Sequence, residues 1–353
     1  MKILLNDGLE KEGIDIFHQA GIETDNKKRD QNQLISDIGQ FDALIVRSAT
    51  KVTREVIEAG AKGKLKIIGR AGVGYDNIDV VAASENGIVV KIAPYGSTNA
   101  VAELAVDLML SISRNTPQAH FTLKNGIWKK KKLAGNELAY KTLALIGCGR
   151  IGQKVAHIAK RGFDMEIIGY DIKPCPESGI KFLTKEEALQ KADYISIHTG
   201  GRDIIIGAKE FDLMKPTVFI INTSRGNNID QQALYNALKE GKIAGYATDV
   251  YKEEPKKEDD PFNDKLRELD NVVLSSHLGA STVEAQRETS IEIARVLSGY
   301  LLGGDFTNAV NASESIEVEE KQVFTLFIHH KDVPGVFANI DKTLADSNIN
   351  IRA

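Results

Sequence analysis

Short hydrophobic runs rich in β-branched residues alternate along the chain with longer stretches in which apolar residues recur every three or four positions. The short runs are typical of buried strands, and the longer stretches are typical of helices that pack on one face. Strands are predicted at 2–6, 43–46, 65–69, 88–91, 142–147, 166–171, 194–198, 217–222, 243–250 and 271–276. Strands that alternate with helices in this way predict an α/β protein with parallel sheets.

Two predicted helices divide these strands between two domains. Apolar residues with helical spacing at 101–112 separate the first four strands from the later six. A second helix of about 21 residues is predicted to begin at a capping box of Ser281 and Glu284 and to end at two glycines. At roughly 30 Å it is long enough to return the chain to the first domain. The predicted domains are a discontinuous one, 1–97 with 282–310, and one inserted into it, 98–281.

The remaining chain, 319–353, has the pattern of a strand, a helix and a second strand. It follows a polar linker. A unit of roughly 30 residues cannot bury enough surface to be stable alone, so we expect it to be part of a larger module.

The composition is typical of a soluble globular protein. Hydrophobic residues make up 42% of the 353 residues and charged residues 27%, and 45 Lys and Arg against 49 Asp and Glu give a formal charge of −4. This balance argues against a nucleic-acid partner. No apolar run reaches the length of a membrane span, so we expect no membrane partner. Cys148 and Cys175 do not form a metal-like pair, so we expect no metal, no disulfide and a cytoplasmic location.

A glycine fingerprint follows the predicted strand at 142–147. Gly147 permits a tight turn, Gly149 lets the backbone approach a pyrophosphate, and Gly152 lets the next helix pack on the strand. Asp171 ends the next strand, 19 residues after Gly152, where a carboxylate can accept hydrogen bonds from a ribose 2′-hydroxyl. The pattern predicts a dinucleotide site. Since Asp171 would repel a 2′-phosphate, it favours NAD over NADP.

A second glycine cluster, Gly72, Val73 and Gly74, follows the strand at 65–69. Its backbone amides could form an anion nest for a carboxylate. A plain turn explains the spacing equally well, and the two interpretations stay open.

Three groups that follow late strands are candidates for chemistry: Arg225, a pair of glutamates at 253 and 254, and His277. Each has a structural interpretation as a surface ion-pair partner, a solvated acid or an ordinary histidine. Hydride transfer to a 2-oxo acid needs a cation to hold the carboxylate and a proton donor near neutral pH. Arginine suits the first role and histidine the second. Ligands of an open α/β sheet lie at the carboxyl ends of its strands, where these residues are expected.

The segments "GCGRIG", "NTSRG", "DVYKEEP" and "HLGAST" together resemble the D-isomer-specific 2-hydroxyacid dehydrogenase family, over residues 3 to 310. The resemblance implies a Rossmann NAD-binding domain inserted into a discontinuous flavodoxin-like substrate domain. It also implies that Arg225 binds the substrate carboxylate and carbonyl, and that His277 exchanges the proton while paired with Glu254, the glutamate before a proline. The cofactor contacts implied by the family are Gly147, Gly149, Arg150, Ile151, Gly152, Asp171, Thr199, Thr223, Asp249, Gly279 and Ala280.

The segments "LIVRSATKVT" and "GRAGVGYDNID" are most similar to family members that act on 3-phosphoglycerate. This implies oxidation of 3-phosphoglycerate by NAD, the first step of serine synthesis, with Arg47, Arg70, Gly72, Val73 and Gly74 as substrate contacts. It further implies a homodimer through 99–128, in which a lysine from 129–132 assists in trans. The tail resembles the opening of an ACT regulatory domain.

Two alternatives stay open. The chain could be a dehydrogenase that reduces another 2-oxo acid, such as hydroxypyruvate, glyoxylate or pyruvate. It could also be a dinucleotide-sensing protein like the corepressors that resemble this family. Four residues depart from the family pattern: Gly200 and Gly201 stand where relatives often have a proline, Asn227 replaces a glycine, and Ser97 replaces an asparagine.

Overall fold

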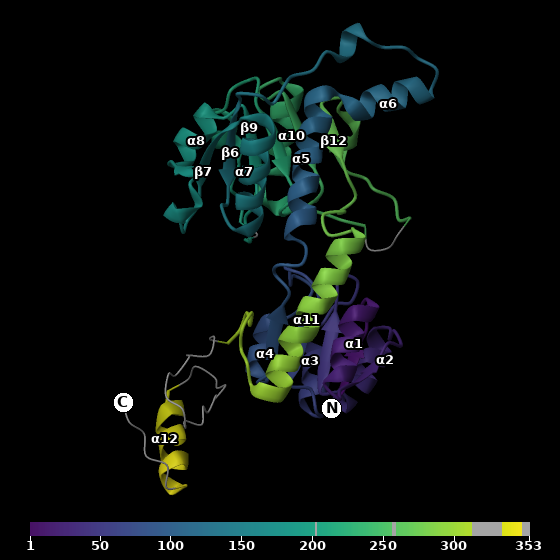
Figure 1. Cartoon of the computed structure of the whole chain (residues 1–353), viewed down its shortest axis with the longest axis vertical. Helices are drawn as coiled ribbons and strands as arrows, with labels where there is room; N and C mark the ends of the chain where they lie inside the picture. Colours follow the sequence, from purple (N-terminus) through teal and green to yellow (C-terminus); the bar gives the residue numbers. More distant parts are fainter. Residues whose placement is uncertain (202, 256–258, 313–333, 348–353) are drawn as a thin grey trace. The chain divides into compact units, whose positions relative to one another are not determined.

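The computed structural model describes residues 1–201, 203–255, 259–312 and 334–347. The chain divides into two compact units. Unit 1 comprises Met1–Gly96 with the described residues from Gln286 onward, and unit 2 comprises Ser97–Ala285. Figure 1 shows that each unit consists of a sheet with helices around it.

Unit 1 contains a five-stranded, fully parallel sheet in the order β2-β1-β3-β4-β5. This is the strand order of flavodoxin-like folds. Its strands are β1 (Lys2–Leu5), β2 (Glu23–Asp25), β3 (Ala43–Val46), β4 (Ile67–Arg70) and β5 (Val89–Ile92).

Helices cover both faces of this sheet because side chains of successive strand residues point to opposite faces. Leu4, Leu44 and Ile68 pack with α2, α3 and α4, while Ile3 and Ile45 pack with α1 and α11. The helices are α1 (Lys11–Gln19), α2 (Gln31–Asp37), η1 (Ile38–Gln40), α3 (Arg54–Ala61), α4 (Val80–Glu85) and α11 (Val283–Gly303).

The segment that follows α11 covers the outer edge of β5. Lys91 and Ala309 form an antiparallel bridge, and the Val310 amide donates to Val90 O at 2.9 Å. The Lys91 side chain is fully buried, and its Nζ donates to Asp305 O at 2.5 Å. Burial lowers the pKa of Lys91 to about 8. The last strand of the sheet is therefore paired on both sides.

Unit 2 contains a seven-stranded, fully parallel sheet in the order β12-β11-β10-β9-β6-β7-β8. Numbered from β6, this is the order 3-2-1-4-5-6 of dinucleotide-binding folds with one strand added. The direction of strand order reverses between β6 and β9, where such folds bind their ligand. The strands are β6 (Thr142–Ile146), β7 (Glu166–Tyr170), β8 (Lys181–Phe182), β9 (Tyr194–Ile197), β10 (Phe219–Asn222), β11 (Gly245–Thr248) and β12 (Val272–Leu274).

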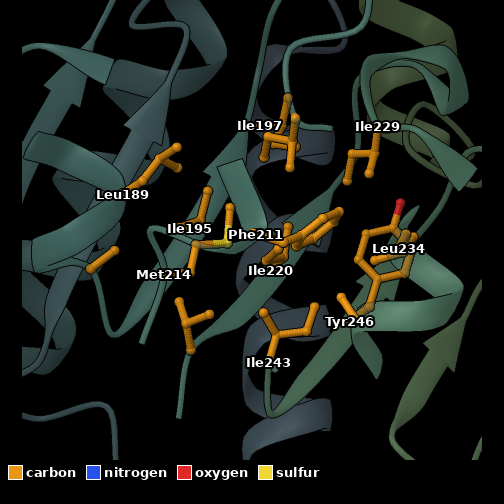
Figure 2. Packing of buried hydrophobic residues seen from close by; sticks show 14 of the residues in the cluster. Leu189, Ile195, Ile197, Phe211, Met214, Ile220, Ile229, Leu234, Ile243 and Tyr246 are labelled. Carbon is orange, nitrogen blue, oxygen red and sulfur yellow. The ribbon is translucent and has the colours of Figure 1, made fainter. Parts of the chain in front are cut away.

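Two hydrophobic cores lie on the two faces of this sheet. On one face the strands pack with α5 and α7, and on the other with α8, α9 and α10. Figure 2 shows the second core, in which Phe211 and Leu234 lie against Ile195, Ile220 and Tyr246 of neighbouring strands. The helices of unit 2 are α5 (Thr98–Arg114), α6 (Thr116–Lys124), η2 (Lys131–Leu133), α7 (Arg150–Phe163), η3 (Pro176–Ser178), α8 (Lys185–Lys191), α9 (Ala208–Phe211), η4 (Gly226–Asn228), α10 (Gln231–Lys239) and η5 (Lys265–Glu268).

The predicted α/β class is confirmed, with two differences in detail. The sheets contain β2 and β8 in addition to the ten predicted strands. The long helix has the predicted length of 21 residues, but its first capping bond is made by Thr282 Oγ1, which accepts from the Ala285 amide at 3.0 Å. The predicted capping role of Ser281 is therefore wrong by one position.

The predicted ACT-like tail falls mostly outside the described residues. Within 334–347 the structure has one helix, α12 (Val336–Asp346), at the position of the predicted helix. Among the described residues no helix is long and apolar enough to cross a membrane. No group of three or more His, Cys, Asp or Glu side chains in that part of the chain could hold a metal ion.

Candidate active site

The glycine turn after β6 fits a dinucleotide in each of its three positions. Gly147 has φ 92°, and a Cβ there would lie 2.6 Å from His198 O, at the end of β9. A Cβ on Gly152 would lie 2.4 Å from Gly147 O. A Cβ on Gly149 would meet no atom of the described chain within 4 Å. The first and third glycines are thus needed for the turn and its packing, and the second leaves the start of α7 open to an anion.

Asp171 lies beside this turn. Its Oδ2 accepts a hydrogen bond from the Cys148 amide at 2.7 Å, and its Oδ1 accepts one from the Lys173 amide at 2.8 Å. These bonds fix the carboxylate between the glycine turn and the end of β7. Arg150 and Ile151 begin α7 directly after the turn. The arrangement suits a carboxylate that accepts ribose hydroxyls.

The next two strand ends carry the predicted threonines. Thr199 follows β9, and its hydroxyl donates to Asn228 Oδ1 at 3.2 Å. Thr223 follows β10, and its buried Oγ1 has no hydrogen-bond partner in the described structure. A buried hydroxyl without a partner is costly. Contact with a bound cofactor would supply one.

Asp249, which follows β11, holds the loop that contains His277. It is 1% exposed, and its Oδ1 accepts from Ser275 Oγ at 2.6 Å and from the Leu278 amide at 2.8 Å. Its Oδ2 accepts from the Gly279 amide at 2.8 Å. Both oxygens are therefore engaged by the loop on either side of His277. The contact of Asp249, Gly279 and Ala280 with a cofactor stays a prediction.

His277 and Glu254 form an imidazole–carboxylate pair. His277 Nδ1 lies 2.8 Å from Glu254 Oε2, with side-chain exposures of 54% and 35%. His277 has φ 57°, a left-handed conformation that is rare for residues other than glycine. The bonds of Asp249 to the next two amides hold the backbone in this conformation. The imidazole is thus held at a defined place. Its Nδ1 is used in the contact with Glu254, and Nε2 is its other ring nitrogen.

The pair shifts the titration of both groups. The hydrogen bond that His277 donates to Glu254 raises the pKa of His277, and the negative charge of Glu254 raises it further, while burial lowers it. Burial by itself would raise the pKa of Glu254, but the bond and charge of His277 hold it below its ordinary value. The result is an imidazole that retains its proton to higher pH beside an ionised carboxylate.

Arg225 lies close enough for its charge to act on both members of the pair, lowering the pKa of each. Its Nη1 donates to Ser224 O at 2.8 Å. The next residue, Gly226, packs so closely that a Cβ there would lie 2.0 Å from the carbonyl carbon of Tyr251. The turn with Arg225 therefore sits directly against the loop with Glu254.

Replacing Glu254 with glutamine should lower the pKa of His277, because the carboxylate's bond and charge both raise it. Because the pKa of His277 is higher in the folded than in the unfolded state, its protonation stabilises the fold. This contribution is complete at pH values below the ordinary pKa of about 6.5 and is lost as the pH rises through the raised pKa. The wild type should therefore lose stability relative to Glu254→Gln over that range. NMR titration of the imidazole and urea unfolding at several pH values measure the two effects. Glu253→Gln is the control; a His277 titration that is the same in Glu254→Gln as in the wild type would contradict the pairing.

The substrate contacts predicted in unit 1 share one edge of its sheet. Arg70 ends β4 and is paired in register with Val46, the residue before Arg47. Gly72 has φ 144°, a conformation that favours glycine, and a Cβ there would lie 1.5 Å from Nη1 at the end of the Arg70 side chain. Val73 and Gly74 continue the turn and are partly buried.

Arg47 is one-fifth exposed and is anchored on several sides. Its amide donates to Asp7 Oδ2 at 2.8 Å, and its Nη2 donates to Ser290 Oγ of α11 at 3.2 Å. Glu10 Oε1 lies 4.0 Å from Nη2. Burial lowers the pKa of Arg47. The guanidinium is therefore fixed in place, and substrate binding by it stays a prediction.

Within unit 2, the structure brings the sequence-predicted triad together. Arg225, Glu254 and His277 follow three strands that are neighbours in the sheet, β10, β11 and β12. Contacts of three further residues were not predicted. Gly226 packs against Tyr251, the Tyr251 hydroxyl donates to Ser275 O, and the Asn228 side chain donates to Gly201 O. For Gly226 a signal was present, since it follows the candidate arginine directly, whereas the contacts of Tyr251 and Asn228 run to segments distant in sequence.

The chain is similar to known proteins in sequence and fold. The profile described as "D-isomer specific 2-hydroxyacid dehydrogenase, NAD binding domain" matches residues 106–279. A D-3-phosphoglycerate dehydrogenase of Methanocaldococcus jannaschii is 46% identical over 319 residues, 88% of this chain and 59% of the relative. A hydroxypyruvate reductase of Thermotoga maritima is 43% identical over 297 residues, 83% of this chain and 95% of the relative.

Among solved structures, an acyclic imino acid reductase in complex with NADPH and D-Arg has a TM-score of 0.76 at 32% identity. The match covers 88% of this chain and all (100%) of that one. The chain spans 59%, 64% and 56% of the lengths of three D-3-phosphoglycerate dehydrogenases that it matches.

Proposed function

Because the chain belongs to the D-isomer-specific 2-hydroxyacid dehydrogenase family, we propose that it is the dehydrogenase part of a D-3-phosphoglycerate dehydrogenase. The reaction is oxidation of 3-phosphoglycerate by NAD⁺ to 3-phosphohydroxypyruvate and NADH. The observation that carries the proposal is the 2.8 Å contact between His277 and Glu254 with the charge of Arg225 beside it. The 46% identity to a D-3-phosphoglycerate dehydrogenase supports the choice of substrate.

Each residue of the triad has one role in this reaction. A dinucleotide held at the glycine turn would supply the acceptor for the hydride from C2 of the hydroxy acid. His277 Nε2 takes the proton of the 2-hydroxyl, and Glu254 at Nδ1 stabilises the resulting imidazolium. Arg225 binds the substrate carboxylate and the oxygen on C2. In reduction the same groups act in reverse, and His277 donates the proton.

Residues of unit 2 fit the dinucleotide. Gly149 and the start of α7 would hold the pyrophosphate, Asp171 the ribose hydroxyls, and Thr223 a further polar group. We propose NAD rather than NADP because a fixed carboxylate at Asp171 repels a 2′-phosphate. Since one similar structure contains NADPH, binding of NADH and NADPH should be compared directly by calorimetry. Tighter binding of NADPH would contradict the role of Asp171.

A second candidate function is reduction of hydroxypyruvate. It is favoured by the similarity to the hydroxypyruvate reductase of Thermotoga maritima, 95% of whose length is matched by this chain. Comparing kcat/KM for 3-phosphohydroxypyruvate, hydroxypyruvate, glyoxylate and pyruvate decides between the two. A clear advantage of the phosphorylated acid supports the main proposal, and its absence refutes it. A corepressor-like sensor would turn over none of them; the intact His277–Glu254 pair favours an enzyme.

Replacing Arg47 with alanine should raise KM for 3-phosphohydroxypyruvate about tenfold or more while changing kcat little, because a cation that binds the phosphate acts equally before and at the transition state. Initial-rate kinetics measure this. KM for hydroxypyruvate, which has no phosphate, is the internal control. Arg54→Ala, at an arginine of unit 1 whose side chain is 43% exposed, is the matched variant. An unchanged KM for the phosphorylated acid would assign its phosphate to other residues.

We propose a homodimer in the cytoplasm as the working form. Helix α6 buries no residue, and Phe121 and Trp128 are 70% and 79% exposed. Large exposed apolar side chains on one segment are typical of interaction surfaces. Cys148 and Cys175 are not joined to each other in a disulfide, as in proteins of reducing compartments. Sedimentation of the wild type and of Phe121→Ser with Trp128→Ser tests the dimer.

A further inference from the structure

Tyr251 touches all three loops that carry the triad. We infer that it is a positioning residue that holds the side chains of Glu254 and His277 in the orientation needed for proton transfer, an inference that rests on the proposed function. Three parts of the residue make the contacts: its amide, its hydroxyl and its carbonyl carbon.

The amide of Tyr251 fixes the carboxylate of Glu254. It donates to Glu254 Oε1 at 3.2 Å, while the other oxygen, Oε2, lies 2.8 Å from His277 Nδ1. With one oxygen held by the loop and the other by the imidazole, the carboxylate cannot rotate without losing a bond. The orientation of the carboxylate toward His277 is therefore set by the backbone at Tyr251.

The hydroxyl of Tyr251 fixes the loop of His277. It donates to Ser275 O at 2.6 Å, two residues before His277. The Ser275 side chain is bound in turn by Asp249. Because His277 has a left-handed backbone conformation, its direction depends on how firmly both flanks are held. Asp249 holds the loop on both sides of His277, and Tyr251 adds a second anchor before it.

The ring and backbone of Tyr251 are themselves fixed. The ring packs edge to face on Phe262, with centroids 4.6 Å apart. The carbonyl carbon lies against Gly226, where a Cβ would come within 2.0 Å. Burial raises the pKa of the Tyr251 phenol, so the hydroxyl remains a donor over the working range of pH. Because the ring is fixed, the hydrogen bond from the Tyr251 hydroxyl to Ser275 O restrains the loop that contains His277.

Tyr251→Phe tests the inference, because it removes the hydroxyl and leaves the amide and the ring. We expect kcat to fall about tenfold, since one hydrogen bond of this kind is lost, with KM for NADH changed less than about twofold. We also expect the pKa of His277, followed by NMR titration, to fall toward its value in Glu254→Gln. The substrate is whichever 2-oxo acid the wild type reduces fastest.

Tyr194→Phe is the matched control. Tyr194 is a buried tyrosine of the same unit and is the first residue of β9. Its hydroxyl accepts a hydrogen bond from Ser113 Oγ at 3.0 Å. It should lose stability without a change in the His277 titration. A wild-type kcat in Tyr251→Phe, or a loss of activity with an unchanged His277 titration, would overturn the inference. If the wild type reduces no 2-oxo acid, the proposed function fails, and the His277 titration still tests Tyr251.

Discussion

His277→Ala should lower kcat for the 2-oxo acid that the wild type reduces fastest by about three orders of magnitude, within the range that general acid catalysis contributes. The variant keeps Arg225 and Glu254 but has no group to protonate the developing alkoxide. The His277 side chain contacts Glu254 and is not part of the glycine turn, so the affinity for NADH should change less than about twofold. Initial rates and calorimetric titration with NADH measure the two quantities.

The control for this variant is His157→Ala, at an exposed histidine on α7 of the same unit. It should retain wild-type rates. Turnover near the wild-type value in His277→Ala would remove His277 from the mechanism. A parallel loss of NADH binding would instead indicate that the loop from Ser275 to Gly279 collapses without the imidazole.

Arg225→Lys should lower kcat/KM by about a hundredfold although it keeps the positive charge. A guanidinium presents two parallel donors to a carboxylate, and an ammonium does not. The charge felt by Glu254 and His277 is preserved, so the pH dependence should change little. Steady-state kinetics over a range of pH separate the loss of fit from a change in titration.

Arg161→Lys, at an exposed arginine near the end of α7, is the matched control and should behave as the wild type. An unchanged kcat/KM in Arg225→Lys would mean that the substrate carboxylate is held by another cation. A large shift of the pH profile would mean that Arg225 acts mainly through the His277–Glu254 pair.

The sequence predicted the strands that lie inside the sheets and missed one at an edge of each. β2 has the sequence ETD and β8 has KF, and both are short edge strands. An interior strand is buried on both faces and therefore shows a hydrophobic run. An edge strand of two or three residues needs only a few backbone bonds, which leave no pattern in the side chains.

The grouping of the site residues could be predicted because the carboxyl ends of parallel strands lie at the same edge of a sheet. The triad and the fingerprint follow strands whose existence the hydrophobic runs indicated, but the order of those strands in the sheet was not predicted. The contacts that orient the triad were not predictable, because they join a side chain to a backbone atom far along the chain. Tyr251 to Ser275 O spans 24 residues, and Asp249 reaches amides 29 and 30 residues away. No residue type marks a carbonyl or amide as a partner.

The pairing of the segment after α11 with β5 has a consequence for handling the protein. A sheet edge with unpaired amides and carbonyls is a template for strands of other molecules. Removal of the residues after α11 would uncover the outer edge of β5 and take away Asp305 O, one of the two carbonyl groups to which Lys91 Nζ donates. We therefore expect a chain shortened before Ala309 to aggregate more readily than one that retains the residues paired with β5.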